Sequence, residues 1–125
     1  MNNLFDIACN FSSDRFDSDL NEVIKRAKDN KVTKFLIVSA SLEDTKKVNN
    51  IYEDNKDSCF FTIGVHPHNA NEFNSSSSLQ MKHLIKEYKP HSVGETGLDF
   101  FRNISTYEEQ LFAFEQQIQI AVETN

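Results

Sequence analysis

A stretch with the residue types of a metal or phosphate site lies near the end of the sequence. Residues 92–102 read SVGETGLDFFR, so that two glycines surround Glu95, and Asp99 and Arg102 follow. A carboxylate at the end of a buried strand, beside glycines that let the backbone turn, is a common way to hold a metal ion or a substrate. The alternative is a surface loop in which Asp99 and Arg102 form an ion pair.

A second stretch offers imidazole groups in the same setting. Residues 62–68 read TIGVHPH and bring His66 and His68 to the end of an apolar run. Because parallel strands end at one edge of a sheet, both loops are expected to reach the same place. An imidazole beside Pro67 can equally be a capped loop residue, so this pattern alone leaves both interpretations open.

Composition limits what such a site can do. The 125 residues include 38% hydrophobic residues and 11 Phe, which suits one globular domain with a real core. The formal net charge of −6 argues against a broad basic surface for nucleic acid, because such binding rests on many Lys and Arg contacts to phosphate. Any phosphate chemistry is therefore expected to be local and metal-assisted.

The cysteines and the hydropathy pattern indicate the compartment. Cys9 and Cys59 fall inside apolar strand-like runs, as expected of buried free thiols in a reducing environment. The N-terminus does not resemble a signal segment, and no apolar run approaches the roughly 18 residues of a membrane helix. A cytoplasmic protein, or a nuclear one in a eukaryote, is expected, with no membrane partner.

Hydrophobic periodicity predicts strands and helices in alternation. The first apolar run is interrupted at Asp6, the second and third are almost wholly apolar, and the fourth is short and centred on Val93. An amphipathic repeat follows each run. The predicted strands cover residues 4–9, 35–39, 59–65 and 91–95, and the predicted helices begin near residues 17, 41, 78 and 105.

Two helix starts carry specific signals. The serine run at residues 75–78 is expected to be a flexible loop that ends in an N-cap. Ser105 and Glu108 are spaced as a capping box for the last helix. The apolar positions of that helix predict its buried face, which comprises Leu111, Phe114, Ile118 and Ala121.

The alternation predicts a parallel sheet, because helical crossovers are how parallel strands are joined. Two α/β architectures fit four strand and helix units. One is a four-stranded doubly wound sheet, and the other is half of an eightfold barrel, for which roughly 250 residues would be typical.

Three motifs at their proper spacing resemble the TatD family of metal-dependent hydrolases. They are DIACNFSSDRF at residues 6–16, GVHPHNA at residues 64–70 and VGETGLDFFR at residues 93–102. Gln110, Phe114 and Gln117 are similar to the helix that follows in that family. The resemblance implies a TIM-barrel-like (β/α) fold of which residues 1–125 would be the N-terminal half, with the first four βα units.

The resemblance also implies a function: a divalent-metal-dependent deoxyribonuclease of the exonuclease type that hydrolyses phosphodiester bonds of DNA. Mg²⁺ is the expected metal, with Mn²⁺ or Zn²⁺ as alternatives. Carried over by position, Glu95 is a metal ligand and, with His66, catalytic. His66, His68 and Arg102 are expected to bind substrate, and Asp6, Asn10 and Asp99 to brace the site.

Two departures from the family pattern bear on activity. Many relatives have His-x-His where this chain has Ala8 and Asn10, and later strands of the family supply two His and an Asp that residues 1–125 do not contain. A second hypothesis is therefore a half barrel without activity of its own, which acts with a complementary half or by self-association. An isolated half is expected to be marginal, oligomeric or rearranged. A third is hydrolysis of another ester or an amide.

Overall fold

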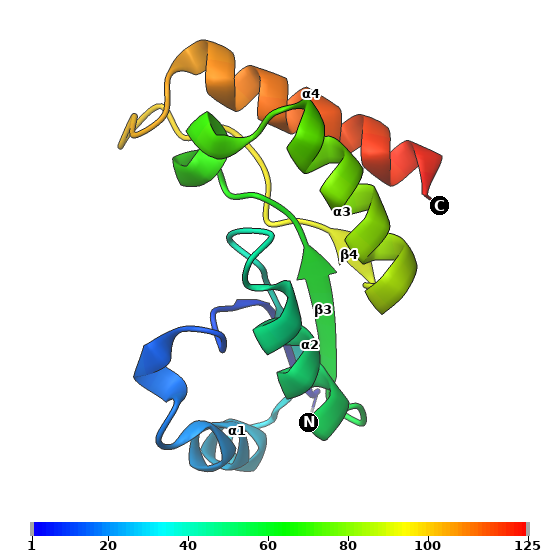
Figure 1. The fold of residues 1–125 in the computed structure, drawn as a ribbon. Coiled ribbons are helices and arrows are strands. Elements are labelled where there is room, and N and C mark those ends of the chain that lie inside the picture. Colours follow the sequence, from blue (N-terminus) through cyan, green and yellow to red (C-terminus); the bar gives the residue numbers. More distant parts are fainter. Residues whose placement is uncertain (1, 125) are drawn as a thin grey trace.

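The computed structural model describes residues 2–124 and arranges them as four β-strands, each followed by an α-helix (Figure 1). Two short 3₁₀ helices, η1 and η2, lie in the loops after the first and third strands. The elements are β1 (Leu4–Cys9), η1 (Asp14–Phe16), α1 (Leu20–Asp29), β2 (Val32–Ile37), α2 (Thr45–Asp54), β3 (Cys59–Ile63), η2 (Pro67–Glu72), α3 (Ser75–Tyr88), β4 (Ser92–Val93) and α4 (Tyr107–Glu123).

The strands form one parallel sheet in the order β1-β2-β3-β4, which is also their order in the sequence. Ile37 lies opposite Phe61, and Ile63 lies opposite Val93. A sheet that grows in one direction with a helix after every strand is a half barrel, whereas a doubly wound sheet reverses its order. The TIM-barrel-like prediction is therefore confirmed.

Alternate residues of the central strands make the core. Phe35 and Ile37 of β2, and Phe61 and Ile63 of β3, are at most 1% exposed. Each helix adds a buried apolar side chain to the same cluster: Ile24, Val48, Met81 and Ile120. Cys9 and Cys59 are also buried in it and are free thiols, as the sequence predicted.

The serine run belongs to a helix, and its prediction as a flexible loop is wrong. Asn74 is the N-cap of α3, and its Oδ1 accepts hydrogen bonds from the backbone N–H groups of Ser76 (2.9 Å) and Ser77 (3.2 Å). The Ser77 hydroxyl in turn accepts from the Asn74 N–H at 3.1 Å. Small hydroxyl side chains near an N-terminus satisfy free N–H groups, so this run starts the helix.

The capping box of α4 lies one residue later than predicted. Thr106 is the N-cap, and its side chain accepts from Glu109 N while the Glu109 carboxylate accepts from Thr106 N at 2.8 Å. Ser105 instead is buried and donates from its hydroxyl to the backbone oxygen of His68 at 3.1 Å. That tertiary contact fixes Ser105 and leaves Thr106 to cap the helix.

The buried face of α4 is also one residue away from the predicted face. Gln110, Ala113, Gln117 and Ile120 are buried, whereas Ile118 is 47% exposed. Two of the four buried side chains are glutamines, whose amides bind backbone groups of neighbouring loops. Polar side chains can be buried when their hydrogen bonds are made, which hydropathy alone does not register.

Strand β1 lies at the edge of the sheet and is mostly exposed. Leu4 and Ile7 are 59% and 69% exposed, and Phe5 contacts only the ring of Phe60 among aromatic residues described, at 5.5 Å between centroids. Unpaired strand edges with apolar side chains are places where another strand can add. Within residues 2–124, no helix is both long and apolar enough to cross a membrane.

Candidate functional site

The ends of three strands are tied together where the site residues begin. The Glu95 backbone N–H donates to the oxygen of Ser39, which follows β2, at 2.9 Å. The His66 N–H donates to the oxygen of Ala40, also at 2.9 Å. The loops after β3 and β4 are thus both fixed to the loop after β2, which brings Glu95 and His66 to the same edge of the sheet.

A buried hydroxyl network holds β3 against β4 just below these loops. The Thr62 hydroxyl donates to the backbone oxygen of Gly94 and accepts from Ser39 N at 3.1 Å, and the Ser39 hydroxyl donates to Thr62 O at 2.8 Å. A Cβ atom on Gly64 would lie 2.3 Å from the carbonyl carbon of Gly94. Gly64 is therefore required for this close approach of the two backbones.

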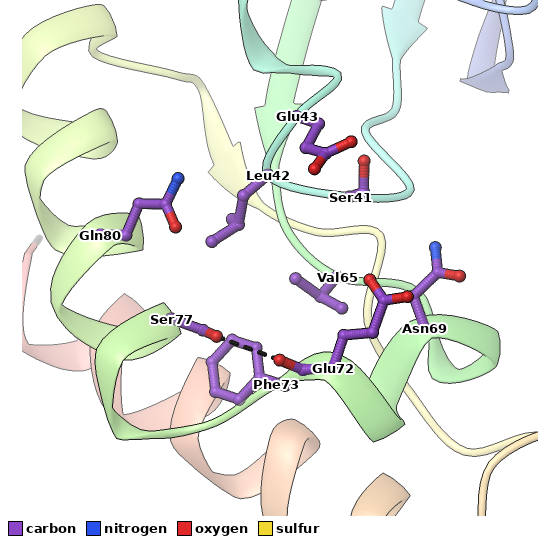
Figure 2. A pocket seen from close by; sticks show the side chains of 9 residues that line it. All are labelled: Ser41, Leu42, Glu43, Val65, Asn69, Glu72, Phe73, Ser77 and Gln80. Carbon is purple, nitrogen blue, oxygen red and sulfur yellow. Dashed lines mark hydrogen bonds between the residues drawn. The ribbon is translucent and has the colours of Figure 1, made fainter.

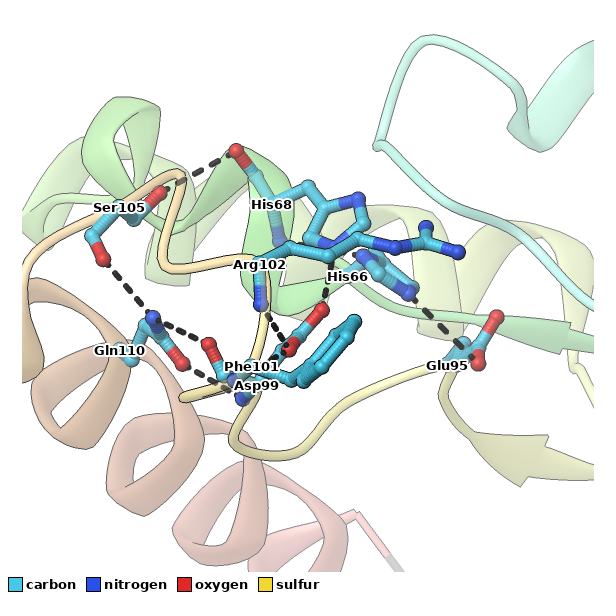
Figure 3. A network of polar contacts seen from close by, with 8 residues as sticks. All are labelled: His66, His68, Glu95, Asp99, Phe101, Arg102, Ser105 and Gln110. Carbon is cyan, nitrogen blue, oxygen red and sulfur yellow. Dashed lines mark hydrogen bonds and ion pairs between the residues drawn. The ribbon is translucent and has the colours of Figure 1, made fainter.

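His66 and Glu95 face each other across a shallow hollow of about 340 Å³ (Figure 3). His66 Nε2 lies 3.8 Å from Glu95 Oε1, and among the described residues the Glu95 carboxylate accepts no hydrogen bond. A carboxylate with free lone pairs that opens on solvent is suited to a cation. The hollow is lined by Asn10, Ala40, His66, His68, Asn69, Glu95 and Arg102.

The hydrogen bonds of His66 define its tautomer. Its Nδ1 accepts the backbone N–H of His68 at 3.1 Å, so the side chain caps η2, as the capped-loop alternative expected. Burial of the ring lowers the pKa of His66 and favours the neutral form, against a smaller opposing effect of the Glu95 carboxylate. A neutral ring with an occupied Nδ1 carries its proton on Nε2, which therefore donates into the hollow.

His68 is paired with Asp99, which joins the loop after β4 to the loop after β3. His68 Nε2 lies 2.5 Å from Asp99 Oδ2, and the rings of His66 and His68 pack edge to face at 4.2 Å. Asp99 Oδ1 accepts the backbone N–H groups of Phe101 and Arg102, each at 3.0 Å. The Arg102 N–H, followed by His68, lowers the pKa of Asp99 to about 2.

The ion pair between Asp99 and Arg102, which the surface-loop alternative implied, is not formed. Asp99 Oδ1 accepts the backbone N–H of Arg102, and Asp99 Oδ2 contacts the imidazole of His68. Within residues 2–124 the Arg102 guanidinium makes no ion pair, and the residue lines the hollow. Asp99 thus connects its own loop to His68 through backbone N–H groups and an imidazole.

Two buried glutamines of α4 fasten both site loops. Gln117 accepts from Val65 N at 2.8 Å and donates to Val65 O at 3.0 Å, so it pins the residue just before His66. Gln110 accepts from Asp99 N at 2.7 Å and donates to the oxygens of Asp99 and Ser105 (Figure 3). The helix therefore sets the positions of His66 and Asp99 by direct hydrogen bonds to their loops.

Asp6 and Asn10 occupy different positions relative to the hollow. Asn10 lines it, whereas Asp6 lies within exposed strand β1. Among the described residues the Asp6 carboxylate accepts only a local hydrogen bond, from Ala8 N at 3.1 Å. The structure thus brings His66, His68, Glu95, Arg102 and Asn10 together around one hollow and places Asp99 behind His68. It does not bring Asp6 to that hollow.

The residues present fit only part of a metal site. Glu95 offers a free carboxylate, but residues 2–124 contain no group of three or more His, Cys, Asp or Glu side chains placed to hold an ion. A catalytic ion usually has about three protein ligands and an open position. The described residues therefore supply an incomplete set of ligands.

A second, smaller hollow of about 180 Å³ lies between the loop after β2 and helix α3 (Figure 2). It is bordered by two acids, Glu43 and Glu72, and by polar and apolar groups such as Gln80 and Phe73, with no basic or imidazole side chain. Two carboxylates without a basic partner repel phosphate. The hollow with His66 and Glu95 is therefore the candidate site.

Sequence reasoning missed the groups that position the site. Thr62, Ser39 and Asn69 were given no role, although Asn69 lines the hollow and donates from Nδ2 to Ala40 O at 3.0 Å. The sequence did contain a signal for these residues, because polar side chains near the ends of strands often hold loops in place. Gln110 and Gln117 did stand out by their similarity to a family helix, but their hydrogen bonds are visible only in the fold.

Comparisons with known proteins identify relatives of this chain. The chain is 37% identical over 122 residues to the 3'-5' ssDNA/RNA exonuclease TatD of Pantoea vagans, covering 98% of the chain and 47% of that relative. It is 39% identical over 120 residues to the exonuclease of the same name from Cronobacter sakazakii, covering 96% and 45%. The chain thus spans about half the length of the curated relatives it matches.

Solved structures show the same fold. A hydrolase TatD family protein from Entamoeba histolytica superposes with a TM-score of 0.84 at 26% identity, covering 98% of this chain and 46% of that one. A TatD homologue from Escherichia coli gives a TM-score of 0.87 at 24% identity, covering 97% and 47%. The family model described as TatD related DNase matches residues 5–125, and the chain therefore belongs to the TatD related DNase family.

Proposed function

We propose that this chain supplies the Glu95 and His66 part of a divalent-metal-dependent nuclease site that hydrolyses phosphodiester bonds. The observation that carries the proposal is the Glu95 carboxylate, which accepts no hydrogen bond among the described residues and opens on one hollow with the Nε2–H of His66 and with Arg102. The family and the relatives named as 3'-5' ssDNA/RNA exonucleases support this reaction class.

Each side chain has a role that follows from its contacts. Glu95 would hold the metal, for which Mg²⁺ is the first candidate because a carboxylate is a hard oxygen ligand, with Mn²⁺ and Zn²⁺ as alternatives. When bound, such an ion activates water and neutralises phosphate charge. Neutral His66 donates from Nε2 to a phosphate oxygen, so it acts as a hydrogen-bond donor and not as the base.

Arg102 and His68 complete the contacts to substrate. The Arg102 guanidinium, without an ion pair among the described residues, can bind a phosphate through two parallel hydrogen bonds. His68 is held by the Asp99 carboxylate through Nε2 and supports the ring of His66 from the side. Together these groups bind and orient a phosphodiester beside Glu95, and they need no broad basic surface.

The activity would belong to a barrel completed by further units. Residues 2–124 lack a third metal ligand, and β1 has a free edge with exposed apolar side chains, as the N-terminal half of a larger barrel would. A complementary second half would supply both the missing ligands and the missing strand neighbours. DNA or RNA with a free single-stranded end is the proposed substrate class.

The test compares nucleotide release by residues 1–125 alone with release by the chain extended along its reading frame beyond residue 125. Glu95→Ala is expected to reduce Mg²⁺- or Mn²⁺-dependent release by on the order of 100-fold. Glu43→Ala, an exposed acid bordering the other hollow, serves as the matched control. Unchanged release by Glu95→Ala would remove the proposed role of this carboxylate.

A further inference from the structure

The loop between β4 and α4 holds a phenylalanine almost entirely in solvent. Phe101 is 96% exposed, more than any other large hydrophobic side chain described. No other aromatic ring among the described residues stacks on it. Its neighbour Phe100 differs, because its ring stacks on Tyr107 at 5.3 Å between centroids and an interplanar angle of 28°. The faces of the Phe101 ring are thus free.

Hydrogen bonds fix the backbone that carries this ring. Asp99 Oδ1 accepts the N–H of Phe101 and that of Arg102, and Gln110 binds both backbone groups of Asp99. Gln110 itself is 1% exposed. The loop is therefore ordered before any ligand arrives, so little conformational entropy remains to be lost at Phe101 on binding.

The same network connects Phe101 to the candidate site. Asp99 binds His68 with its other oxygen, and Arg102, the residue after Phe101, lines the hollow with His66 and Glu95. In Figure 3 the Phe101 ring and the Arg102 side chain both extend from the loop toward the side on which Glu95 lies. A free aromatic face therefore stands beside groups that can bind phosphate.

We infer that Phe101 is a stacking platform for an unpaired base of a single-stranded nucleic acid whose phosphate lies at Arg102 and His66. The inference rests on the proposed function and adds the residue that contacts a base of the substrate. Aromatic side chains bind single strands by stacking on base faces, and one stacked base changes affinity by about 5- to 150-fold. The 13 Lys and Arg are outnumbered by 19 Asp and Glu, so the net charge of −6 does not attract the phosphate backbone and stacking matters more.

Base stacking at Phe101 would also select single strands. In a duplex each base is already stacked on its neighbours and paired, so the ring cannot reach its face unless the end opens. A terminal or single-stranded base has a free face, so moving it onto the Phe101 ring costs less unstacking and unpairing free energy. The ring therefore favours a free single-stranded end over the interior of a duplex.

The sequence contains no Trp, so Phe101→Trp creates a single fluorescent reporter at this position. The emission of this variant is followed during titration with a short oligothymidylate, and binding is measured separately by anisotropy of a labelled oligonucleotide. An oligonucleotide of equal length with abasic residues has the phosphates but no bases. Phe100→Trp is the matched control, because the Phe100 ring already stacks on Tyr107.

Quenching of the Trp by the oligothymidylate but not by the abasic strand is the expected result, with no quenching in Phe100→Trp. Phe101→Ala should weaken single-strand binding by about 10-fold, and Phe101→Tyr should retain it. Circular dichroism verifies that each variant is folded. Phe101→Leu, which keeps apolar area without an aromatic face, should behave like Phe101→Ala.

Oligonucleotide binding without a change in the Trp emission and without loss in Phe101→Ala would overturn the inference and leave the proposed function intact. Absence of any oligonucleotide binding would overturn it too, and the proposed function would then be decided by the Glu95→Ala release assay. Self-association that Phe101→Ala abolishes, without an effect on oligonucleotides, would assign the ring to a protein contact and reject base stacking.

Discussion

Replacing Gln117 with leucine tests how much of the fold depends on a buried polar anchor. The side chain is fully buried, and its amide satisfies both backbone groups of Val65, at 2.8 and 3.0 Å. Leucine has nearly the same volume, so no large cavity forms. The two backbone groups of Val65 would lose their partners, and each buried unsatisfied group costs about 1–3 kcal/mol.

The two groups together cost about 2–6 kcal/mol, and the added apolar burial offsets about 1 kcal/mol, so the free energy of unfolding is expected to fall by about 1–5 kcal/mol. Urea unfolding followed by far-UV circular dichroism measures it. Gln119→Leu is the matched control, because Gln119 lies on the same helix but is exposed and bonds only Glu123 among the described residues. Its change is expected within about 0.5 kcal/mol.

A second substitution at this position sharpens the test. Gln117→Glu keeps an acceptor for the Val65 N–H but buries a carboxylate that cannot donate to the Val65 oxygen. Protonation restores a donor, so the stability gap between this variant and the native chain should narrow as the pH falls. Two results would refute the reasoning. One is a free energy of unfolding for Gln117→Leu that is less than about 1 kcal/mol below that of Gln119→Leu. The other is a stability difference between Gln117→Glu and the native chain that does not depend on pH.

Three further outcomes follow from the structure. Gly64→Ala should destabilise by more than about 2 kcal/mol in the same urea assay, because the new Cβ would lie 2.3 Å from the Gly94 carbonyl carbon; a neutral effect would contradict the close approach. Cys9 and Cys59 should react with DTNB only on unfolding, because burial raises the pKa of Cys9 to about 12 and also raises the pKa of Cys59. Rapid reaction of the native chain would contradict their burial. The pKa of Asp99, about 2, lies below the ordinary value of 3.8, so the ionised carboxylate stabilises the fold above about pH 4 and this stabilisation is lost as the pH falls toward 2. The urea midpoint of the native chain should therefore fall more over this pH range than the midpoint of Asp99→Asn. Equal slopes for the two proteins would argue against this role of Asp99.

Periodicity predicted the sheet because the core follows simple rules. Phe35, Ile37, Phe61 and Ile63 are buried in strands that read as continuous apolar runs, and each run is followed by a helix. Only a parallel arrangement joins such units through helices, so the sequence limited the fold to two architectures. The choice of the half barrel needed the observed strand order, which no local pattern encodes.

The pairing of Glu95 and His66 was also predictable, because parallel strands end at one edge of the sheet. The partner of Asp99 was not. Sequence proximity favoured Arg102, three residues away, but the loop turns so that Asp99 accepts the Arg102 backbone N–H and reaches His68 instead. Loop conformation depends on long-range anchors such as Gln110, and these anchors become visible only in three dimensions.

The error on α4 has a physical cause. The helical repeat is correct, but hydropathy placed Gln110 and Gln117 outside, although the backbone groups of Asp99 and Val65 require polar partners inside.

Strand β1 is an apolar run at an open edge of the sheet, and Leu4 is 59% exposed. Its hydropathy fits a strand with a neighbour on its free side.

The exposed edge of β1 and the incomplete ligand set beside Glu95 have one explanation under the proposed function. Apolar area and a carboxylate are chemically unrelated, so separate local causes would be needed to leave both without partners. Additional βα units would pair β1 and approach Glu95 from the facing side, because in a closed barrel all strands end around the same central hollow.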